Sequence, residues 1–375
     1  MGYVAVKGGA EAIENAEKLM TYERIKGDSD PLDVQQIKEQ LHLMVDRVMG
    51  EGSLYAPDLA ALAIKQSAGD ALEAAFMLRA YRTTLSRLAY ALPQSTAEMR
   101  VIRRISAAFK EIPGGQILGP TPDYTMRLLD FELLDDAKEK RRQTINDLFR
   151  GVELSRIQPL PETFPKVIEL LRNEGLVERT IRGTCQPKDE NRDIFDVTRQ
   201  SLAFPAPRSA ALQTMARAET GGLLLLAYSS MRGYGDIHPT IGELRVGFIP
   251  VRIKHPRTGE PYTVGEIKVT EAEVIARMTG SDGTPRFSLG YALCFGHNET
   301  KAIAMAVLDR AMQTEEPKMI SENQEFVLSH SDGIESMGFC NHYKLPHYIT
   351  FQSDLDRLRR AQKEAGQCAE SENDA

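Results

Sequence analysis

The alternation of apolar and polar residues in GELRVGFIPVRI, residues 242–253, constrains the fold most strongly, because a two-residue period fits a strand with one buried face. The apolar side chains share one face up to Phe248, and from Ile249 onward they share the other. This slip of one residue predicts a β-bulge, and the neighbouring Pro250 suits a bulge or a sheet edge. Two later stretches are further predicted strands, residues 262–270 and 287–295.

The first third of the chain has helical patterns instead. Apolar residues recur at helical spacing over residues 34–48, and Asp70 with Glu73 predicts a capping box for a longer helix that Pro93 ends. We expect helix again over residues 95–110. Helices first and strands later predict the α+β class, with a helical N-terminal region followed by a mixed region that holds a small, mainly antiparallel sheet.

Changes in composition divide the chain into four predicted parts. Residues 1–134 are mainly helical, and residues 135–204 form a charged, proline-containing connection. Residues 205–358 form the mixed region that carries the candidate site. Residues 359–375 form a polar tail, which we expect to be disordered.

Composition also excludes several classes of protein. The net charge of −7 is opposite in sign to that of a basic nucleic-acid-binding domain. The apolar runs are far shorter than the roughly 20 residues that cross a bilayer. The N-terminal residues have no basic region followed by an apolar one, so we expect a cytoplasmic protein. The four cysteines have no C-x-x-C spacing, so we expect the chain to hold no iron–sulfur cluster by itself.

His342 and His347 form the first candidate site. Five residues of helix turn through about 500°, which leaves two side chains about 140° apart, and Pro346 rules out a helix interior. The two imidazoles can therefore meet at one metal ion only across an irregular turn. Catalytic zinc usually has three protein ligands, so a third would come from His330 or from another chain. The alternative is a pair of exposed or structurally bonded histidines.

A glycine-containing turn in SMRGYGDIHP, residues 230–239, is the second candidate. Gly233 and Gly235 let backbone amides approach an anion, and Arg232 can grip a phosphate or phosphonate with two parallel hydrogen bonds. His238 lies in the same turn. The turn is not a phosphate-binding P-loop, because no G-x-x-x-x-G-K-[ST] motif occurs in the chain. The alternative is a purely structural turn.

Several stretches of the chain resemble one known family. The most distinctive are RRISAAFKEIPGGQILGPTPDYTMRLLDF at 103–131, YSSMRGYGDIHP at 228–239 and HYKLPHY at 342–348. The family is that of the carbon–phosphorus lyase core-complex subunit PhnI, from bacterial phosphonate breakdown. The resemblance covers roughly residues 3–134 and 205–358, in order, whereas residues 135–200 match nothing that we can place.

The resemblance implies a reaction. Members of this family displace adenine from the ribose C1′ of ATP with an oxygen of an alkylphosphonate such as methylphosphonate, and they form ribose 1-phosphonate 5-triphosphate. Alone, such a subunit resembles a purine nucleosidase, in which water replaces the phosphonate. The implied partners are a radical iron–sulfur subunit, two smaller core subunits and ABC-type ATPase subunits. The chain is then expected to be a transferase subunit that uses ATP.

The resemblance also implies site residues. His342 and His347 match two zinc ligands of the family, and a histidine of the neighbouring radical subunit is the implied third ligand. For the displacement, Arg232 and the two glycine amides of its turn are our candidates for holding an anionic group. His238 is a candidate acid or anion contact.

Two other functions compete with this one. The first is a scaffold subunit without chemistry of its own, which donates zinc ligands at a subunit interface and releases no adenine from ATP. The second is a self-contained zinc hydrolase that uses His330, His342 and His347 and holds stoichiometric zinc in the isolated chain. The absence of an H-E-x-x-H helix makes the hydrolase the weakest of the three.

Overall fold

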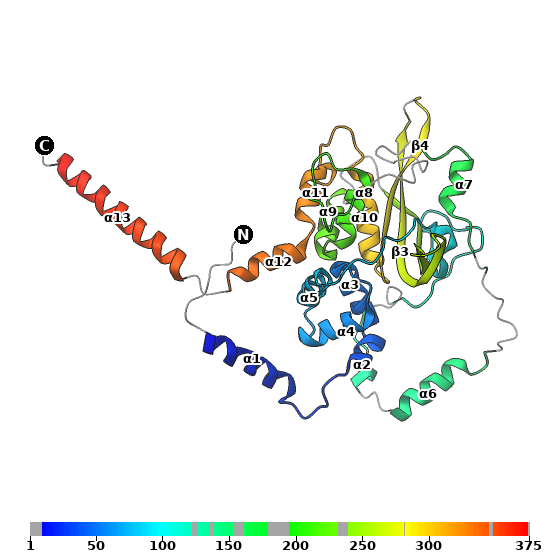
Figure 1. Ribbon diagram of the computed structural model, residues 1–375. Coiled ribbons are helices and arrows are strands. Elements are labelled where there is room, and N and C mark those ends of the chain that lie inside the picture. Colours follow the sequence, from blue (N-terminus) through cyan, green and yellow to red (C-terminus); the bar gives the residue numbers. More distant parts are fainter. Residues whose placement is uncertain are drawn as a thin grey trace. The chain divides into compact units, whose positions relative to one another are not determined.

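The computed structural model describes most of the chain (Figure 1). The described residues are 10–121, 127–134, 138–152, 161, 163–178, 195–231, 239–280, 282–344 and 348–373. Internal contacts divide the chain into two compact units, Met1–Arg82 with Asp332–Ala375, and Thr83–Ser331. The boundaries that composition places after residues 134, 204 and 358 stay predictions.

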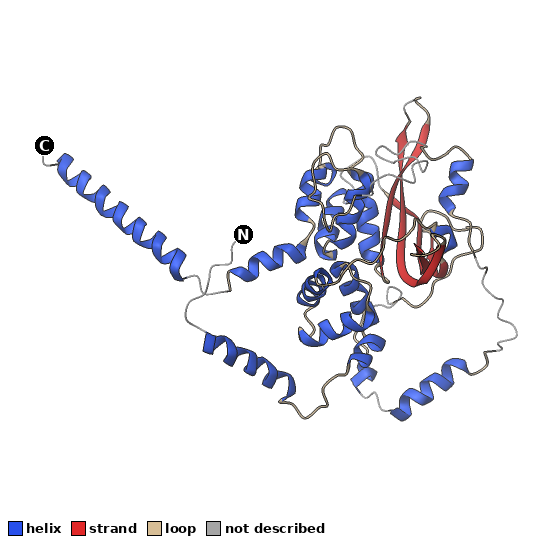
Figure 2. Cartoon of the chain, in the orientation of Figure 1, coloured by secondary structure: helices blue, strands red, loops and turns tan. Residues whose placement is uncertain are grey.

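The unit Thr83–Ser331 contains a four-stranded antiparallel sheet with the order β1-β2-β3-β4 (Figure 2). The strands are β1 (Arg100–Ile105), β2 (Thr240–Lys254), β3 (Pro261–Thr279) and β4 (Pro285–Phe295). The three strands predicted from the sequence are confirmed as parts of β2, β3 and β4. The expected α+β class, with helices first and an antiparallel sheet later, is confirmed as well.

The irregularity predicted in β2 lies close to Pro250. The pairing of β2 with β3 shifts register between Val251 and Arg252. On its other side, β2 pairs with β1 only from Leu244 to Phe248. Pro250 therefore lies beyond the stretch where β2 is paired on both sides, which explains why the sheet tolerates its missing N–H.

Three predicted segments differ in the structure. Residues 95–110 are not a helix: part of them forms β1, because pairing with β2 outweighs the local helical spacing. The helix that was expected to end at Pro93 is α5 (Ala71–Thr83), which stops well before that proline. The polar tail is helical to Asn373 as part of α13 (Tyr348–Asn373), since its alanine, glutamate and glutamine residues favour helix.

One face of the sheet packs against helices. α10 (Glu299–Ala311) contacts β3 and β4, and α8 (Arg208–Arg217) and α9 (Thr220–Met231) pack against α10. Leu244, Ala272 and Ala292 are buried in this apolar core. Gly290 of β4 allows the close approach of α10, because a Cβ at this position would overlap the carbonyl oxygen of Ala306.

The opposite face of the sheet has a smaller apolar cluster around α7 (Val167–Asn173). Ile168 is fully buried there with Ile275 of β3 and Leu289 of β4. α7 falls within the segment that the sequence predicted to be a connection, so this part of the segment belongs to the core of the unit.

In the other unit, short helices bury an apolar core that includes Val48, Ala60 and Ile64. They are α2 (Val34–Gln40), α3 (His42–Gly52), α4 (Pro57–Gln66) and α5. Leu41 divides the helix predicted over residues 34–48 into α2 and α3. The predicted cap of α5 is present, because Asp70 Oδ1 accepts the amide hydrogen of Glu73 at 3.1 Å.

The remaining described elements are short or lie outside these cores. They are α1 (Ala10–Ile25), α6 (Lys138–Phe149), α11 (Gln324–His330), α12 (Gly333–His342), and the 3₁₀ turns η1 (Thr96–Glu98), η3 (Phe131–Leu134) and η5 (Ile320–Glu322). Among the helices of the described residues, none combines the length and the apolar composition that a membrane crossing needs.

Candidate functional site

Most residues predicted to form a site lie outside the described part of the chain. They are Arg232, Gly233, Gly235, His238 and His347. His342 is the last residue of α12, and its side chain is not among those described. The anion-binding, catalytic and zinc-binding roles expected of these six residues stay predictions.

The two histidines of the predicted zinc site do not share a helix, because α12 ends at His342 and α13 begins at Tyr348. Imidazole suits zinc, but two imidazoles fall short of the usual three protein ligands. Within the described residues, no group of three or more His, Cys, Asp or Glu side chains could hold a metal ion.

His330, the possible third ligand, contacts its own helix. Its Nδ1 lies 2.7 Å from the carbonyl oxygen of Phe326, and because a carbonyl only accepts, Nδ1 carries the hydrogen. The imidazole also stacks on the ring of Phe326, with 4.3 Å between centroids. These contacts give His330 a local structural role, and its metal-binding role stays a hypothesis.

A cavity of about 490 Å³ lies beside α10. Its lining mixes charged and apolar residues: Ser230, Pro239, Val307, Arg310, Ala311, Thr314, Glu315, Glu316, Lys318, Met319 and Glu322. In the sequence, Ser230 and Pro239 lie on either side of the predicted anion-binding turn. Small-molecule sites commonly have volumes of roughly 300–1,000 Å³, so the cavity is large enough for a small ligand.

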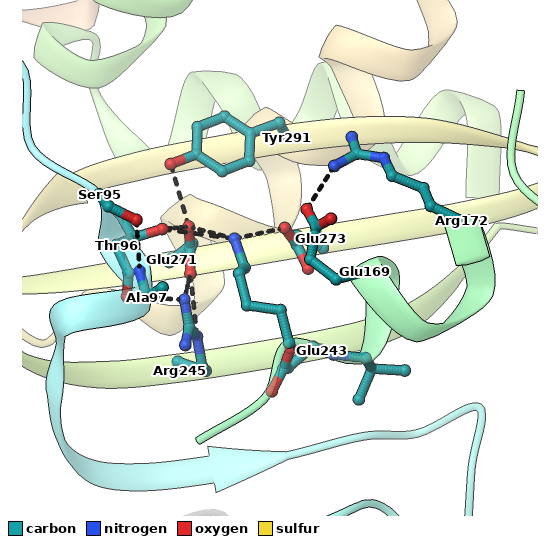
Figure 3. A network of polar contacts seen from close by, with 12 residues as sticks. Ser95, Thr96, Ala97, Glu169, Arg172, Glu243, Arg245, Glu271, Glu273 and Tyr291 are labelled. Carbon is teal, nitrogen blue, oxygen red and sulfur yellow. Dashed lines mark hydrogen bonds and ion pairs between the residues drawn. The ribbon is translucent and has the colours of Figure 1, made fainter. Parts of the chain in front are cut away.

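A row of charged side chains is buried across the sheet face opposite α10, and Figure 3 shows most of it. The register places Arg104 of β1 opposite Arg245 of β2, and Arg245 opposite Glu271 of β3. Glu243 of β2 lies opposite Glu273 of β3 in the same way. None of these five side chains belongs to a residue that is more than 4% exposed. We call these five residues, with Lys166, the buried charge network.

Glu271 contacts several side chains in and around this network (Figure 3). Its Oε2 accepts from Nε of Arg245 at 2.9 Å. Its Oε1 accepts from the hydroxyls of Thr96 at 2.5 Å and Tyr291 at 3.1 Å. Lys166 Nζ lies 3.0 Å from the same oxygen and 2.6 Å from Glu273 Oε1, so one ammonium group bridges two carboxylates.

The two bridged carboxylates have opposite pKa shifts. Burial raises the pKa of Glu273 to about 7, and the neighbouring negative charge of Glu271 adds to this increase against the opposing effect of Lys166. Burial also opposes ionisation of Glu271, but the charges of Arg245 and Lys166 outweigh it and hold the pKa of Glu271 below its ordinary value. Glu271 is therefore the ionised member of the pair near neutral pH.

A carboxyl with a pKa of about 7 is suited to acid–base chemistry, but access decides whether it takes part. Glu273 is 4% exposed, and the lining of the described cavity contains none of the network residues. Within the described part of the chain, its Oε2 has no hydrogen-bond partner. We therefore assign the network to the architecture of the sheet, and the cavity is the better candidate for binding a ligand.

A second polar cluster joins β1 to the start of α10. Arg103 pairs with Glu299 and also donates to the carbonyl of Leu118. His297 Nε2 lies 3.5 Å from the other carboxylate oxygen of Glu299. Burial opposes ionisation of Glu299, yet His297 and Arg103 hold its pKa below the ordinary value. This cluster therefore fixes the N-terminal end of α10 against the sheet.

Sequence reasoning missed the buried charge network. The segments E-L-R at 243–245 and E-A-E at 271–273 place charges two residues apart in strands, which usually indicates a solvated face. The one available signal is that opposite charges occur on both strands. Whether such charges meet depends on strand register, which the alternation of a single strand does not fix.

The described residues form an α+β fold with a cavity of small-molecule size beside α10, and comparisons with known proteins agree on one family. A family model described as "Bacterial phosphonate metabolism protein (PhnI)" matches residues 2–365. The alpha-D-ribose 1-methylphosphonate 5-triphosphate synthase subunits PhnI of Escherichia coli (strain K12) and Rhizobium meliloti (strain 1021) are 46% and 43% identical, each over 369 residues. These alignments cover 96% of the chain, and 99% and 95% of the two relatives.

A further relative is named "Putative C-P lyase subunit protein HtxH" and comes from Stutzerimonas stutzeri. It is 55% identical over 372 residues, which cover 97% of each protein. The chain belongs to the PhnI family of bacterial phosphonate metabolism proteins.

Proposed function

We propose that the chain is a subunit of an alpha-D-ribose 1-methylphosphonate 5-triphosphate synthase and acts in phosphonate metabolism. The observation that supports this most directly is its end-to-end similarity to two proteins of that name, which covers 96% of the chain. A similarity of this extent includes the sheet, the cavity and both segments that carry the predicted site residues.

In the proposed reaction, an oxygen of an alkylphosphonate attacks the ribose C1′ of ATP, the C1′–N bond breaks, and adenine leaves with a proton. Breaking this bond develops positive charge on the ribose, and the leaving base needs a proton donor. Arg232 and the amides of its glycine-containing turn hold an anionic group of the reactants. His238 is the candidate proton donor. Ser230 and Pro239, which flank this segment in the sequence, line the cavity, and this supports the proposal.

The proposal includes a shared zinc ion. His342 and His347 supply two imidazole ligands, and a histidine of the radical subunit supplies a third. Donor chemistry supports this arrangement, as does the end of α12 at the first histidine. A zinc ion bound there would link ligands from two chains, so its expected contribution is to the subunit interface.

The proposed assembly contains the radical iron–sulfur subunit, two smaller core subunits and ABC-type ATPase subunits. The word "subunit" in the names of the relatives supports a multisubunit complex. A cytoplasmic location belongs to the same proposal, because ATP is the co-substrate.

Release of adenine tests the proposed reaction. The purified chain is incubated with ATP, with and without methylphosphonate and companion subunits, and adenine and ribose products are quantified. We expect ribose 1-methylphosphonate 5-triphosphate only when phosphonate and companion subunits are both present, and slow adenine release by hydrolysis from the chain alone. If no combination releases adenine, the chain is a scaffold subunit and the catalytic proposal is wrong.

A further inference from the structure

Arg310 of α10 is a half-buried cation at the wall of the cavity. Its Nε donates to Ser288 Oγ at 3.2 Å, which is a contact with a neutral hydroxyl. Burial lowers the pKa of Arg310, and the charge of Glu322 opposes this effect. Glu322 also lines the cavity, but no ion pair within 4.0 Å joins it to Arg310 in the described structure.

Two poorly exposed arginines of the same unit, Arg104 and Arg208, have carboxylate partners. Arg104 pairs with Glu243 at 2.6 Å, and Arg208 pairs with Asp309 at 2.5 Å. This is the usual arrangement, because a guanidinium group removed from water needs a compensating negative charge. Among the described residues, no carboxylate pairs with Arg310 within 4.0 Å, and Arg310 lines the cavity, where an anionic ligand would supply the compensating charge.

The surroundings of Arg310 suit a small amphiphilic anion. Lys318 adds a second cation to the lining. Val307, Ala311 and Met319 add an apolar surface that an alkyl group can contact. Arginine presents parallel N–H donors that match two oxygens of a tetrahedral phosphorus group.

The acidic residues of the cavity limit the charge of the ligand. Among the described lining residues, Glu315, Glu316 and Glu322 are acidic, and Arg310 and Lys318 are basic. The Glu322 carboxylate already accepts the amide hydrogens of Lys318 at 2.8 Å and Met319 at 3.0 Å. The several negative charges of a triphosphate would be repelled by these carboxylates. A single phosphorus group carries less charge and can lie next to Arg310 without moving them.

We propose that Arg310 and Lys318 bind one tetrahedral phosphorus oxyanion in this cavity, of the alkylphosphonate class, with its alkyl group against Val307 and Met319. This inference rests on the proposed function, which it deepens by assigning the phosphonate a site. Inorganic phosphate and a phosphate group of ATP share the same recognition chemistry, so the test separates these sources.

Binding to the full chain is measured by titration calorimetry with methylphosphonate, inorganic phosphate, ATP and adenosine in separate experiments. The variants are Arg310→Gln and Arg310→Lys, with the exposed Arg100→Gln of β1 as a control that removes the same charge. Loss of a charge-assisted bidentate contact should weaken methylphosphonate binding about 10- to 100-fold in Arg310→Gln. Arg310→Lys should show a smaller loss, and Arg100→Gln should bind as the unmodified chain does.

Three results would overturn the proposal: equal methylphosphonate binding by Arg310→Gln and the unmodified chain, no methylphosphonate binding by either, or a loss in Arg310→Gln confined to ATP. A loss for methylphosphonate and phosphate, with ATP and adenosine unchanged, supports it. Adenine release by the assembled complex is measured in parallel. Adenine release without Arg310-dependent binding of methylphosphonate would disprove this site and keep the proposed function. Arg310-dependent binding without adenine release would keep this site and disprove the proposed function.

Discussion

Arg104 and Glu243 form an ion pair that is almost completely removed from solvent, with Nε 2.6 Å from Oε1 and neither side chain more than 1% exposed. Arg104 also donates to the carbonyl oxygens of Pro113 at 2.6 Å and Pro165 at 2.8 Å. Glu243 accepts the amide hydrogen of Val167 at 2.9 Å. The pair therefore ties β1 and β2 to the start of α7.

Arg104→Met should reduce the free energy of unfolding by about 3–5 kcal/mol, because it leaves a buried carboxylate without its partner. Urea denaturation followed by circular dichroism measures this change. Arg100→Met is the matched control, since Arg100 lies on the same strand but its pair with Glu266 is exposed, and such pairs contribute less than about 1 kcal/mol. Equal stability of the two variants would show that the buried pair is not important for folding.

Glu273→Gln should change how stability depends on pH. The folded-state pKa of Glu273 is about 7 against an ordinary 4.5, so the folded protein binds more protons than the unfolded chain between these values. The contribution of Glu273 to the free energy of unfolding is fully present below pH 4.5 and is lost as pH rises through 7. The variant, which cannot ionise, should gain on the order of 2–3 kcal/mol relative to the unmodified protein between pH 5 and pH 8.

The measurement for Glu273 is urea denaturation at a series of pH values. Glu169→Gln on α7 is the control, because Glu169 has an exposed side chain paired with Arg172. A constant difference between Glu273→Gln and the unmodified protein from pH 5 to pH 8 would contradict the raised pKa.

Gly290→Ala should destabilise the protein by about 1–3 kcal/mol or more, because the added methyl group overlaps the Ala306 carbonyl and lies 2.7 Å from Arg310 Cβ. Displacement of α10 should also weaken methylphosphonate binding. Thermal unfolding and calorimetry measure the two effects. Gly265→Ala on β3 is the control, since nothing lies within 4 Å of its new methyl group. The close packing of α10 would be disproved if the two alanine variants unfolded at the same temperature.

His342→Ala and His347→Ala should each lower the zinc content of the assembled complex at least about tenfold, because each removes one imidazole from the proposed shared site. The isolated chain should bind zinc weakly in every case. Atomic emission of the purified complex gives the metal stoichiometry, with His42→Ala as the control. Full zinc content in both variants would assign the metal to other residues.

Arg232→Ala should reduce adenine displacement by the complex at least about tenfold while the unfolding temperature stays within about 2 °C of the unmodified protein. Arg257→Ala, at an exposed turn between β2 and β3, removes the same charge away from the predicted site. Initial rates of adenine release compare the two. Undiminished release in Arg232→Ala would remove Arg232 from the site.

The α+β class, the strands β2, β3 and β4, and the resemblance to the PhnI family could all be predicted from the order of the residues. These follow from local patterns: alternation of apolar residues, glycine and proline positions, and long uncommon segments such as the one from Arg103 to Phe131. The cap of α5 was predicted as well, because Asp70 acts on amides only two or three residues away.

Tertiary structure alone decided the role of the polar strand positions and of β1. Residues 95–110 have helical spacing, yet Arg100–Ile105 pair with β2, which lies far away in the sequence. Likewise, Arg245 and Glu271 meet because β2 and β3 pair in one register, and a shift of one residue would turn them to opposite faces. In the sequence these charged residues suggest a solvated surface, but in the folded chain they are buried and form a network. Arg310 lies beside the cavity without a carboxylate partner among the described residues.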